Sequence, residues 1–334
     1  MNKKLSLENK IKNSNFQITK NFLYYAIAPV VVLLVGIILL CTVGFNASTE
    51  FTGGSTFSVY VNNGGEYSQS TTYDIDKDYN LLCGKIADVL NEENCVVESF
   101  HKTQIDIEGV VAGGDAIKVV FKNSSENVEG QNQAIKDRVL SAIYGDSSNE
   151  DAMTDVSSFK GTISLGWTIA LVGAVIFAIA LASIYLAFRG RSPMWLIAVV
   201  QGVIDIMVTA GLILICRIPV GTGVAAVIAS CGFVSLVNCF CFLSRAKHNI
   251  ANGLYDKITK SRMADTTTKE LAFKKGIIAA VCAIIVILLT IVPVSGIRYA
   301  ALSALVMLIT TFYTTHFITP ALWTATYKTT KKIK

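Results

Sequence analysis

Six long runs of hydrophobic residues divide the chain. The first, residues 22–45, has no charge; it is longer than the core of a signal peptide and long enough to span a membrane as a helix. The other five are 163–187, 195–216, 222–243, 277–292 and 299–323. Each is close to the length of a transmembrane helix, and the fifth, the shortest, stops at Pro293. The pattern predicts an α-helical polytopic membrane protein with six transmembrane helices.

After the first run, hydrophobic residues recur with the short spacings of strands and soluble helices. Hydrophobic and polar residues alternate over 56–61, which predicts a strand. A helix is predicted over 79–91 from the spacing of four between Leu82, Ile86 and Leu90. Strands are also expected at 95–100, 116–121 and 156–159, and a second helix at 131–144. The order β-α-β-β-α-β is that of a ferredoxin-like fold, so residues 46–162 are predicted to form an independent α+β domain.

The distribution of charge predicts the orientation. Residues 46–160 hold 19 acids and 8 bases, although the whole chain has a net charge of +5. Nineteen Lys and Arg lie in the connections on one side of the predicted spans, against Arg217 and Arg298 in the short loops of the other side. The positive-inside rule puts both termini in the cytosol and the acidic domain on the other side of the membrane.

This topology divides the chain into five parts: a cytosolic segment 1–21, the first helix 22–45, the outer domain 46–162, a five-helix bundle 163–323 and a basic cytosolic tail 324–334. The bundle includes a cytosolic loop, 244–275, in which Ile250, Leu254 and Ile258 predict an amphipathic helix on the inner membrane surface. Its bases suit anionic membrane lipid.

Several function classes have no support in the sequence. The bases flank apolar runs rather than forming one basic face, which argues against nucleic acid. No metal-ligand spacing, hydrolase elbow or phosphate loop is present, so no cofactor, no metal and no enzymatic activity are expected. Cys83 and Cys95 are the only cysteines outside the apolar runs; a disulfide and two buried thiols are both open.

Asp205 is the only acid within a predicted span. A charge at that depth costs about 2.5–3.5 kcal/mol, so such residues are usually functional or paired. A membrane carboxyl that gains and loses a proton suits proton-driven transport; the alternative is a structural hydrogen bond between helices. Gln201 lies one turn earlier, and Asn238 of the antiparallel fourth run is expected at a similar depth. His316 in the sixth run fits either titration or helix–helix bonding.

Four segments, in order along the chain, resemble SecF proteins of bacterial protein export. Glu50-Phe51-Thr52-Gly53-Gly54 resembles the D-F-T-G-G segment that opens their outer domain, and Asp205 to Gly211 resembles the H-D-x5-G stretch of their third span. The stretch with Ser235, Asn238, Arg245 and Lys247 resembles their G-Y-S-x-N-D…F-D-R-x-R-E-N sequence. Arg298 to Pro320 resembles the closing I-R-G-F-A…P segment.

The resemblance implies a role in protein export. SecF pairs with a SecD subunit, associates with the Sec channel and uses the proton gradient to help draw polypeptide outward. It implies proton handling at Asp205 and Arg245, with Asn238 and Gln201 nearby. The family's Asn-Asp pair is Val237-Asn238 here, and the Asp before the arginine is Ser244, so a second carboxyl would come from a partner. Half of a proton-driven exporter of small molecules or lipids is the main alternative, and a scaffold or receptor without transport is a third.

Overall fold

The computed structural model describes residues 11, 14, 17–62, 73, 75–105, 114–123, 128–145, 152–161, several between 173 and 188, 194–253, 259–292 and 295–326. They form two compact units. The α+β unit comprises Ala47–Ser164 with Pro293–Ser295, and the helical unit comprises Met1–Asn46, Leu165–Val292 and Gly296–Lys334. The division agrees with the change from mixed to continuous hydrophobic patterning along the chain.

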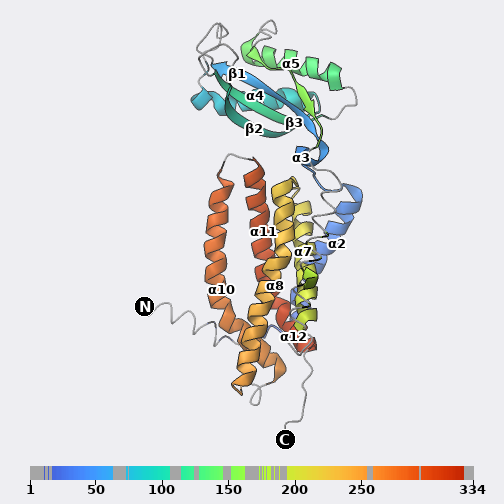
Figure 1. Cartoon of the computed structure of the whole chain (residues 1–334), viewed down its shortest axis with the longest axis vertical. Helices are drawn as coiled ribbons and strands as arrows, with labels where there is room; N and C mark the ends of the chain where they lie inside the picture. Colours follow the sequence, from blue (N-terminus) through green and yellow to red (C-terminus); the bar gives the residue numbers. More distant parts are fainter. Residues whose placement is uncertain are drawn as a thin grey trace. The chain divides into compact units, whose positions relative to one another are not determined.

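The α+β unit contains a four-stranded antiparallel sheet in the order β2-β3-β1-β4 (Figure 1). A short helix, α3 (Thr49–Thr52), precedes the first strand. The elements that follow are β1 (Gly54–Asn62), α4 (Ile75–Glu92), β2 (Val96–Ile105), β3 (Gly114–Lys122), α5 (Val128–Tyr144) and β4 (Ser157–Phe159). Each overlaps the strand or helix that periodicity predicts, because alternating and fourfold spacing reflect the faces that the core buries.

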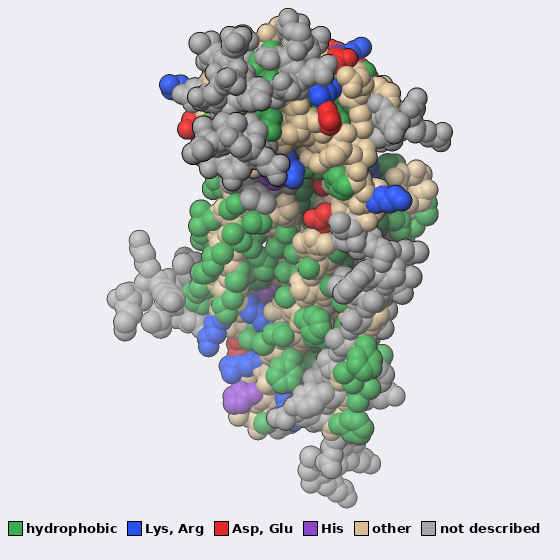
Figure 2. Space-filling model, turned by 45° about the horizontal axis from the view of Figure 1, so that its top comes forward, with side chains coloured by type: hydrophobic (Ala, Val, Ile, Leu, Met, Phe, Trp, Pro, Cys, Tyr) green, Lys and Arg blue, Asp and Glu red, His purple; other side chains and the backbone are tan. Residues whose placement is uncertain are grey.

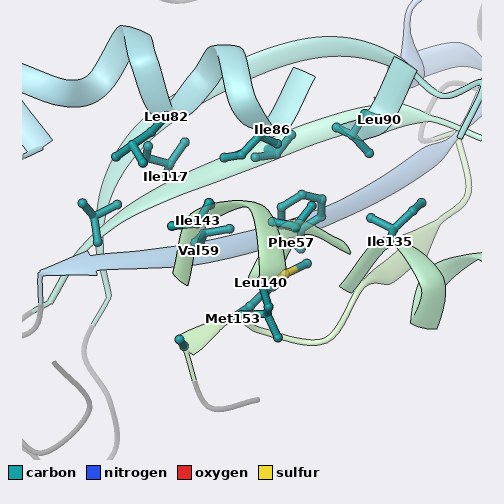
Figure 3. Close-up of a cluster of buried hydrophobic side chains, with 14 of the residues drawn as sticks. Phe57, Val59, Leu82, Ile86, Leu90, Ile117, Ile135, Leu140, Ile143 and Met153 are labelled. Carbon is teal, nitrogen blue, oxygen red and sulfur yellow. The ribbon is translucent and has the colours of Figure 1, made fainter. Parts of the chain in front are cut away.

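The core of this unit lies between the sheet and the two long helices (Figure 3). Leu82, Ile86 and Leu90 of α4 are fully buried, as their spacing predicts. They face alternate residues of the strands, including Phe57 and Phe121, whose rings meet edge to face with centroids 5.7 Å apart.

Cys95 belongs to this core and Cys83 packs against it, and no disulfide joins the two. Of the two arrangements that the sequence left open, the structure therefore does not have the disulfide. Burial raises the pKa of the Cys83 thiol above its ordinary value, which keeps it protonated and unreactive near neutral pH.

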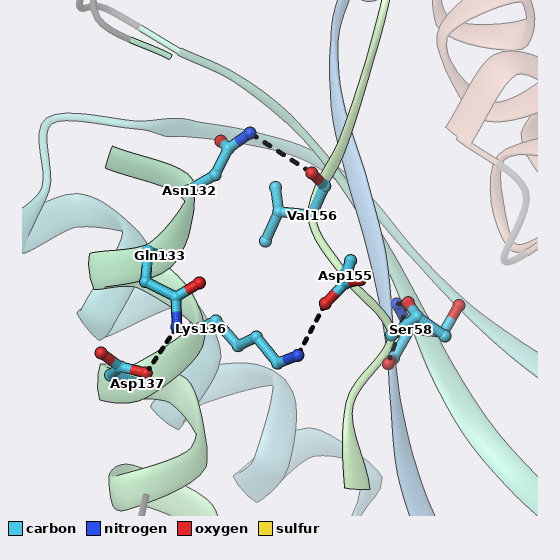
Figure 4. A network of polar contacts seen from close by, with 8 residues as sticks. Ser58, Asn132, Gln133, Lys136, Asp137, Asp155 and Val156 are labelled. Carbon is cyan, nitrogen blue, oxygen red and sulfur yellow. Dashed lines mark hydrogen bonds and ion pairs between the residues drawn. The ribbon is translucent and has the colours of Figure 1, made fainter. Parts of the chain in front are cut away.

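Polar contacts attach the segment before β4 to α5 (Figure 4). Lys136 Nζ lies 2.7 Å from the exposed Asp155 carboxylate, and Asn132 Nδ2 donates to the Val156 carbonyl at 3.3 Å. The hydrogen bond and the charge of Lys136 lower the pKa of Asp155. The short last strand is thus held by side chains as well as by its three-residue register with β1.

The helical unit contains five described helices or helix pairs that are long and apolar enough to cross a membrane. They are α2 (Phe22–Thr42), α7 (Met194–Ile215), α8 (Thr222–Ala251), α10 (Lys260–Thr290), and α11 (Ser295–Phe317) with α12 (Thr319–Thr326). Hydrophobic side chains gather over the long helices on the face shown in Figure 2. The chain is therefore a multi-pass membrane protein. The second expected span, 163–187, lies mostly outside the described residues, although those described within it, such as Ile179, are helical.

Two expected elements have other bounds in the structure. Because α8 continues to Ala251 and α10 begins at Lys260, both helices extend into the expected loop 244–275. Of the residues that predicted an amphipathic helix there, Ile250 belongs to α8, and Leu254 and Ile258 lie outside the described residues. The sixth run, expected over 299–323, lies within one candidate span, Gly296–Thr326, which has a break between α11 and α12 at Ile318. Pro320 explains the break, since a proline is tolerated in the first turn of α12 but not inside a longer helix.

Glycines let α2 and α7 approach closely. A Cβ on Gly36 would lie 3.0 Å from the Gly211 Cα, and one on Gly211 would lie 3.4 Å from Val32. Small residues at such a crossing bring two helix backbones together inside a membrane. The first span is therefore packed directly on α7, the helix that carries Asp205.

Candidate functional site

Asp205 lies near the middle of α7 and is fully buried, as is Gln201 one turn before it. Gln201 Nε2 donates to Asp205 Oδ1 at 3.0 Å. The sequence predicts this pair, because residues four apart share one face of a helix. Its burial in an apolar helix bundle makes the carboxyl expensive to keep ionised.

Two other helices bring hydroxyl groups to the carboxyl. Ser235 of α8 and Thr314 of α11, both fully buried, lie close enough to interact with it. Neither makes a well-formed hydrogen bond to Asp205: among the described residues, Asp205 Oδ2 and Ser235 Oγ have no partner. The Gln201 Oε1 atom is in the same state.

Unsatisfied buried oxygens of this kind are rare in folded proteins and need an explanation. A carboxylate only accepts hydrogen bonds, whereas a protonated carboxyl also donates one. A proton on Asp205 Oδ2 would supply the donor that the neighbouring Ser235 hydroxyl can accept. The arrangement is therefore suited to taking up and releasing a proton.

Threonines of α11 extend this polar interior, and the sequence analysis did not single them out. Thr310, Thr311, Thr314 and Thr315 are all buried. Thr311 and Thr314 donate to carbonyls of the preceding turn, and Thr310 and Thr315 have hydroxyls without a described partner. Two adjacent pairs four residues apart in an apolar run are the signal that could have revealed this stripe. Thr209 and Cys231 add a contact of 3.3 Å between α7 and α8.

Asn238, expected near Asp205, has a different contact. Its backbone carbonyl accepts a hydrogen bond from Lys275 Nζ of α10 at 2.9 Å. The α8 residue at the carboxyl is Ser235, almost one turn earlier. Asn238 therefore marks where α10 joins α8.

Arg245 belongs to a second polar cluster. It lies ten residues after Ser235 on α8, about 15 Å along a helix axis. Its Nε donates to Glu270 Oε2 of α10 at 2.7 Å. Buried Asn249 donates to the same oxygen at 3.3 Å and to Thr267 Oγ1 at 3.1 Å. The sequence pattern grouped Arg245 with Asp205; in the structure its partner is Glu270, which the sequence analysis missed.

His316 is buried in α11, where Nδ1 lies 2.7 Å from the Phe312 carbonyl. Its Nε2 has no partner among the described residues. The bond to its own helix turn does not support a helix–helix hydrogen bond.

The remaining motif residues lie elsewhere. Lys247 and Arg298 are exposed, and Pro320 is the second residue of α12. Glu50, Phe51 and Thr52 form α3, and Gly53 and Gly54 lead directly into β1. Gly53 has φ +79°, and a Cβ there would lie 2.7 Å from the Phe159 carbonyl oxygen. The two glycines are required by a tight passage of backbone.

The family model for the C-terminal region of the protein export membrane proteins SecD and SecF matches residues 141–329. The chain belongs to the SecD/SecF family. The match covers the helices that carry Asp205, Ser235, Thr314 and Arg245. Both polar clusters are thus within the part of the chain that defines its SecD/SecF membership.

Solved SecDF structures have the same fold. A crystal structure of SecDF in a super-membrane-facing form matches with a TM-score of 0.69 and 16% identity, over 94% of this chain and 39% of that one. SecDF from Thermus thermophilus, described as a translocon-associated membrane protein, matches with a TM-score of 0.59 and 15% identity, again over 94% and 39%. This chain spans only that share of the SecDF chains. None of the curated proteins compared with it matches.

Proposed function

We propose that this chain is a SecF-like accessory subunit of the Sec machinery, which works with a SecD-like partner and uses the proton gradient to assist polypeptide translocation. In this proposal both termini are cytosolic, the α+β unit is a ferredoxin-like domain outside a bacterial cell membrane, and the second hydrophobic run forms a sixth span. The match covers 94% of this chain but 39% of the solved SecDF chains, so the role of the whole assembly is part of the proposal.

The observation that carries the proposal is the environment of Asp205. Its carboxyl is buried in a membrane bundle, bonded through one oxygen, and surrounded by hydroxyl and amide groups from three helices. A scaffold has no need for a buried carboxyl with an unpartnered oxygen. A proton-coupled subunit needs a group of this kind. Within the described residues of this chain, Arg245 pairs with Glu270, so we assign the proton step to Asp205 with Gln201, Ser235 and Thr314.

The test is export of a secreted reporter in cells depleted of this protein and complemented with variants. Asp205→Asn keeps the shape and the bond from Gln201 but removes the titratable group, so we expect export to fall toward the depleted level. Asp265→Asn is the matched control: Asp265 is also buried, it accepts the Thr19 N–H at 3.0 Å, and an asparagine oxygen still accepts that bond.

Equal membrane levels of all variants must be shown by blotting. Export by Asp205→Asn at the wild-type rate would reject the proton role and favour a scaffold. Normal secretion together with a defect in lipid export or in drug resistance would instead indicate the small-molecule exporter.

A further inference from the structure

The short linker Gly44-Phe45-Asn46 connects α2 to the α+β unit, which begins at Ala47. Three hydrogen bonds hold this linker to the turn between α7 and α8. Arg217 Nη1 donates to the Gly44 carbonyl at 2.9 Å, Asn46 Nδ2 donates to the Arg217 carbonyl at 3.2 Å, and the Val220 N–H donates to the Asn46 carbonyl at 2.7 Å. We call this set of contacts the latch. Asn46, which takes part in two of the three bonds, is the last residue of the helical unit before the chain enters the α+β unit.

Arg217 occupies an unusual backbone position. Its φ of +53° is left-handed, and its N–H and that of Ile218 bond to carbonyls of the last turn of α7. This is the helix-ending conformation that glycine normally supplies, because a side chain is disfavoured there. The exposed arginine is compatible with the negative end of the helix dipole, but its guanidinium is bonded to the linker. The sequence thus keeps a long donor side chain where a glycine would satisfy the backbone.

The latch is at the end of the helix that carries the proposed proton site. Asp205 precedes Arg217 by twelve residues, which is about 18 Å along one helix. In addition, α2 packs on α7 through Gly36 and Gly211. A shift of α7 would therefore reach the linker in two ways. The hydrogen bonds of the latch would transmit it at the end of α7, and the close backbone contact between α7 and α2 would transmit it through α2, which leads into the linker.

We propose that Arg217 and Asn46 are positioning residues that transmit movement of α7 to the α+β unit when Asp205 gains or loses a proton. The inference rests on the proposed function and adds the residues that couple the membrane site to the outer domain. Its specific consequence is that proton uptake and export can be separated by changing the latch.

Arg217→Gly tests this directly, since glycine adopts the left-handed conformation freely and only the side-chain bond is lost. Asn46→Ala removes a second bond of the latch and lies outside any helix. Arg262→Ala is the matched control for loss of an exposed arginine. Each variant is expressed in depleted cells, and both reporter export and Asp205-dependent proton uptake into membrane vesicles are measured. The uptake is the difference between each variant and its Asp205→Asn double mutant.

We expect both latch variants to lower export by about fivefold or more, the lower end of typical coupling between sites, while proton uptake stays near wild type. Wild-type export in Arg217→Gly and Asn46→Ala would overturn the inference. Parallel loss of export and proton uptake would also overturn it, because it would show a structural role in the bundle. If Asp205→Asn alone leaves export and uptake unchanged, the proposed function fails, which is a different result from an inactive latch.

Discussion

At the scale of single residues, Asp205 is notable for the bond it lacks as much as for the one it makes. Gln201 fixes one carboxyl oxygen, while the other faces hydroxyl groups without an established bond among the described residues. A purely structural carboxyl in a membrane would be expected to have both oxygens satisfied. The half-satisfied carboxyl is the observation on which the proposed proton role of Asp205 rests.

Asp155 supports a prediction about pH at the same scale. Lys136 lowers its pKa in the folded state from the ordinary value of 3.8, so the ionised form contributes stability above that value. This contribution is lost as the pH falls through the lowered pKa. We expect the urea midpoint of the wild-type α+β unit to fall more steeply below about pH 4 than that of Asp155→Asn. Parallel curves for the two proteins would contradict the assignment.

At the scale of elements, the join between α8 and α10 depends on Asn249 more than on the ion pair beside it. Asn249 is buried and donates to both Thr267 and Glu270, whereas Arg245 is partly exposed to solvent. Exposed ion pairs contribute little, but a buried polar partner left unsatisfied is costly.

We therefore expect Asn249→Ala to destabilise the protein by about 1–3 kcal/mol, seen as a lower thermal midpoint in detergent. The exposed neighbour Lys247 is the control, and Lys247→Ala should change stability by less than about 0.5 kcal/mol. Equal midpoints for the two variants would show that the join does not depend on the buried amide.

Sequence patterning predicts elements well where one face is buried. Leu82, Ile86 and Leu90 located α4, and the Gln201–Asp205 spacing predicted a contact that the structure has. It does not predict contacts between distant segments. Glu270 meets Arg245 across 25 residues, and Arg217 meets Gly44 across 173. Helix ends also escaped prediction, since hydropathy marks the apolar part of α10 but not the polar turns that precede it.

At the scale of the whole molecule, the α+β unit has a hydrophobic core composed only of its own residues. A compact unit with its own core is able to fold alone. We expect residues 47–161, expressed without the helices, to unfold in urea in one cooperative transition. A chain that shows no cooperative transition would mean that the unit needs the helical part in order to fold.

The contact of Gly54 with Phe159 has a consequence for the history of the chain. The first and last strands pair there, and Gly161 lies against Phe51. The backbone therefore enters and leaves the α+β unit at neighbouring points. A segment with adjoining ends can be gained, exchanged or deleted in a single genetic event without changing the path of the chain on either side. The membrane helices and the α+β unit are thus free to diverge as separate modules.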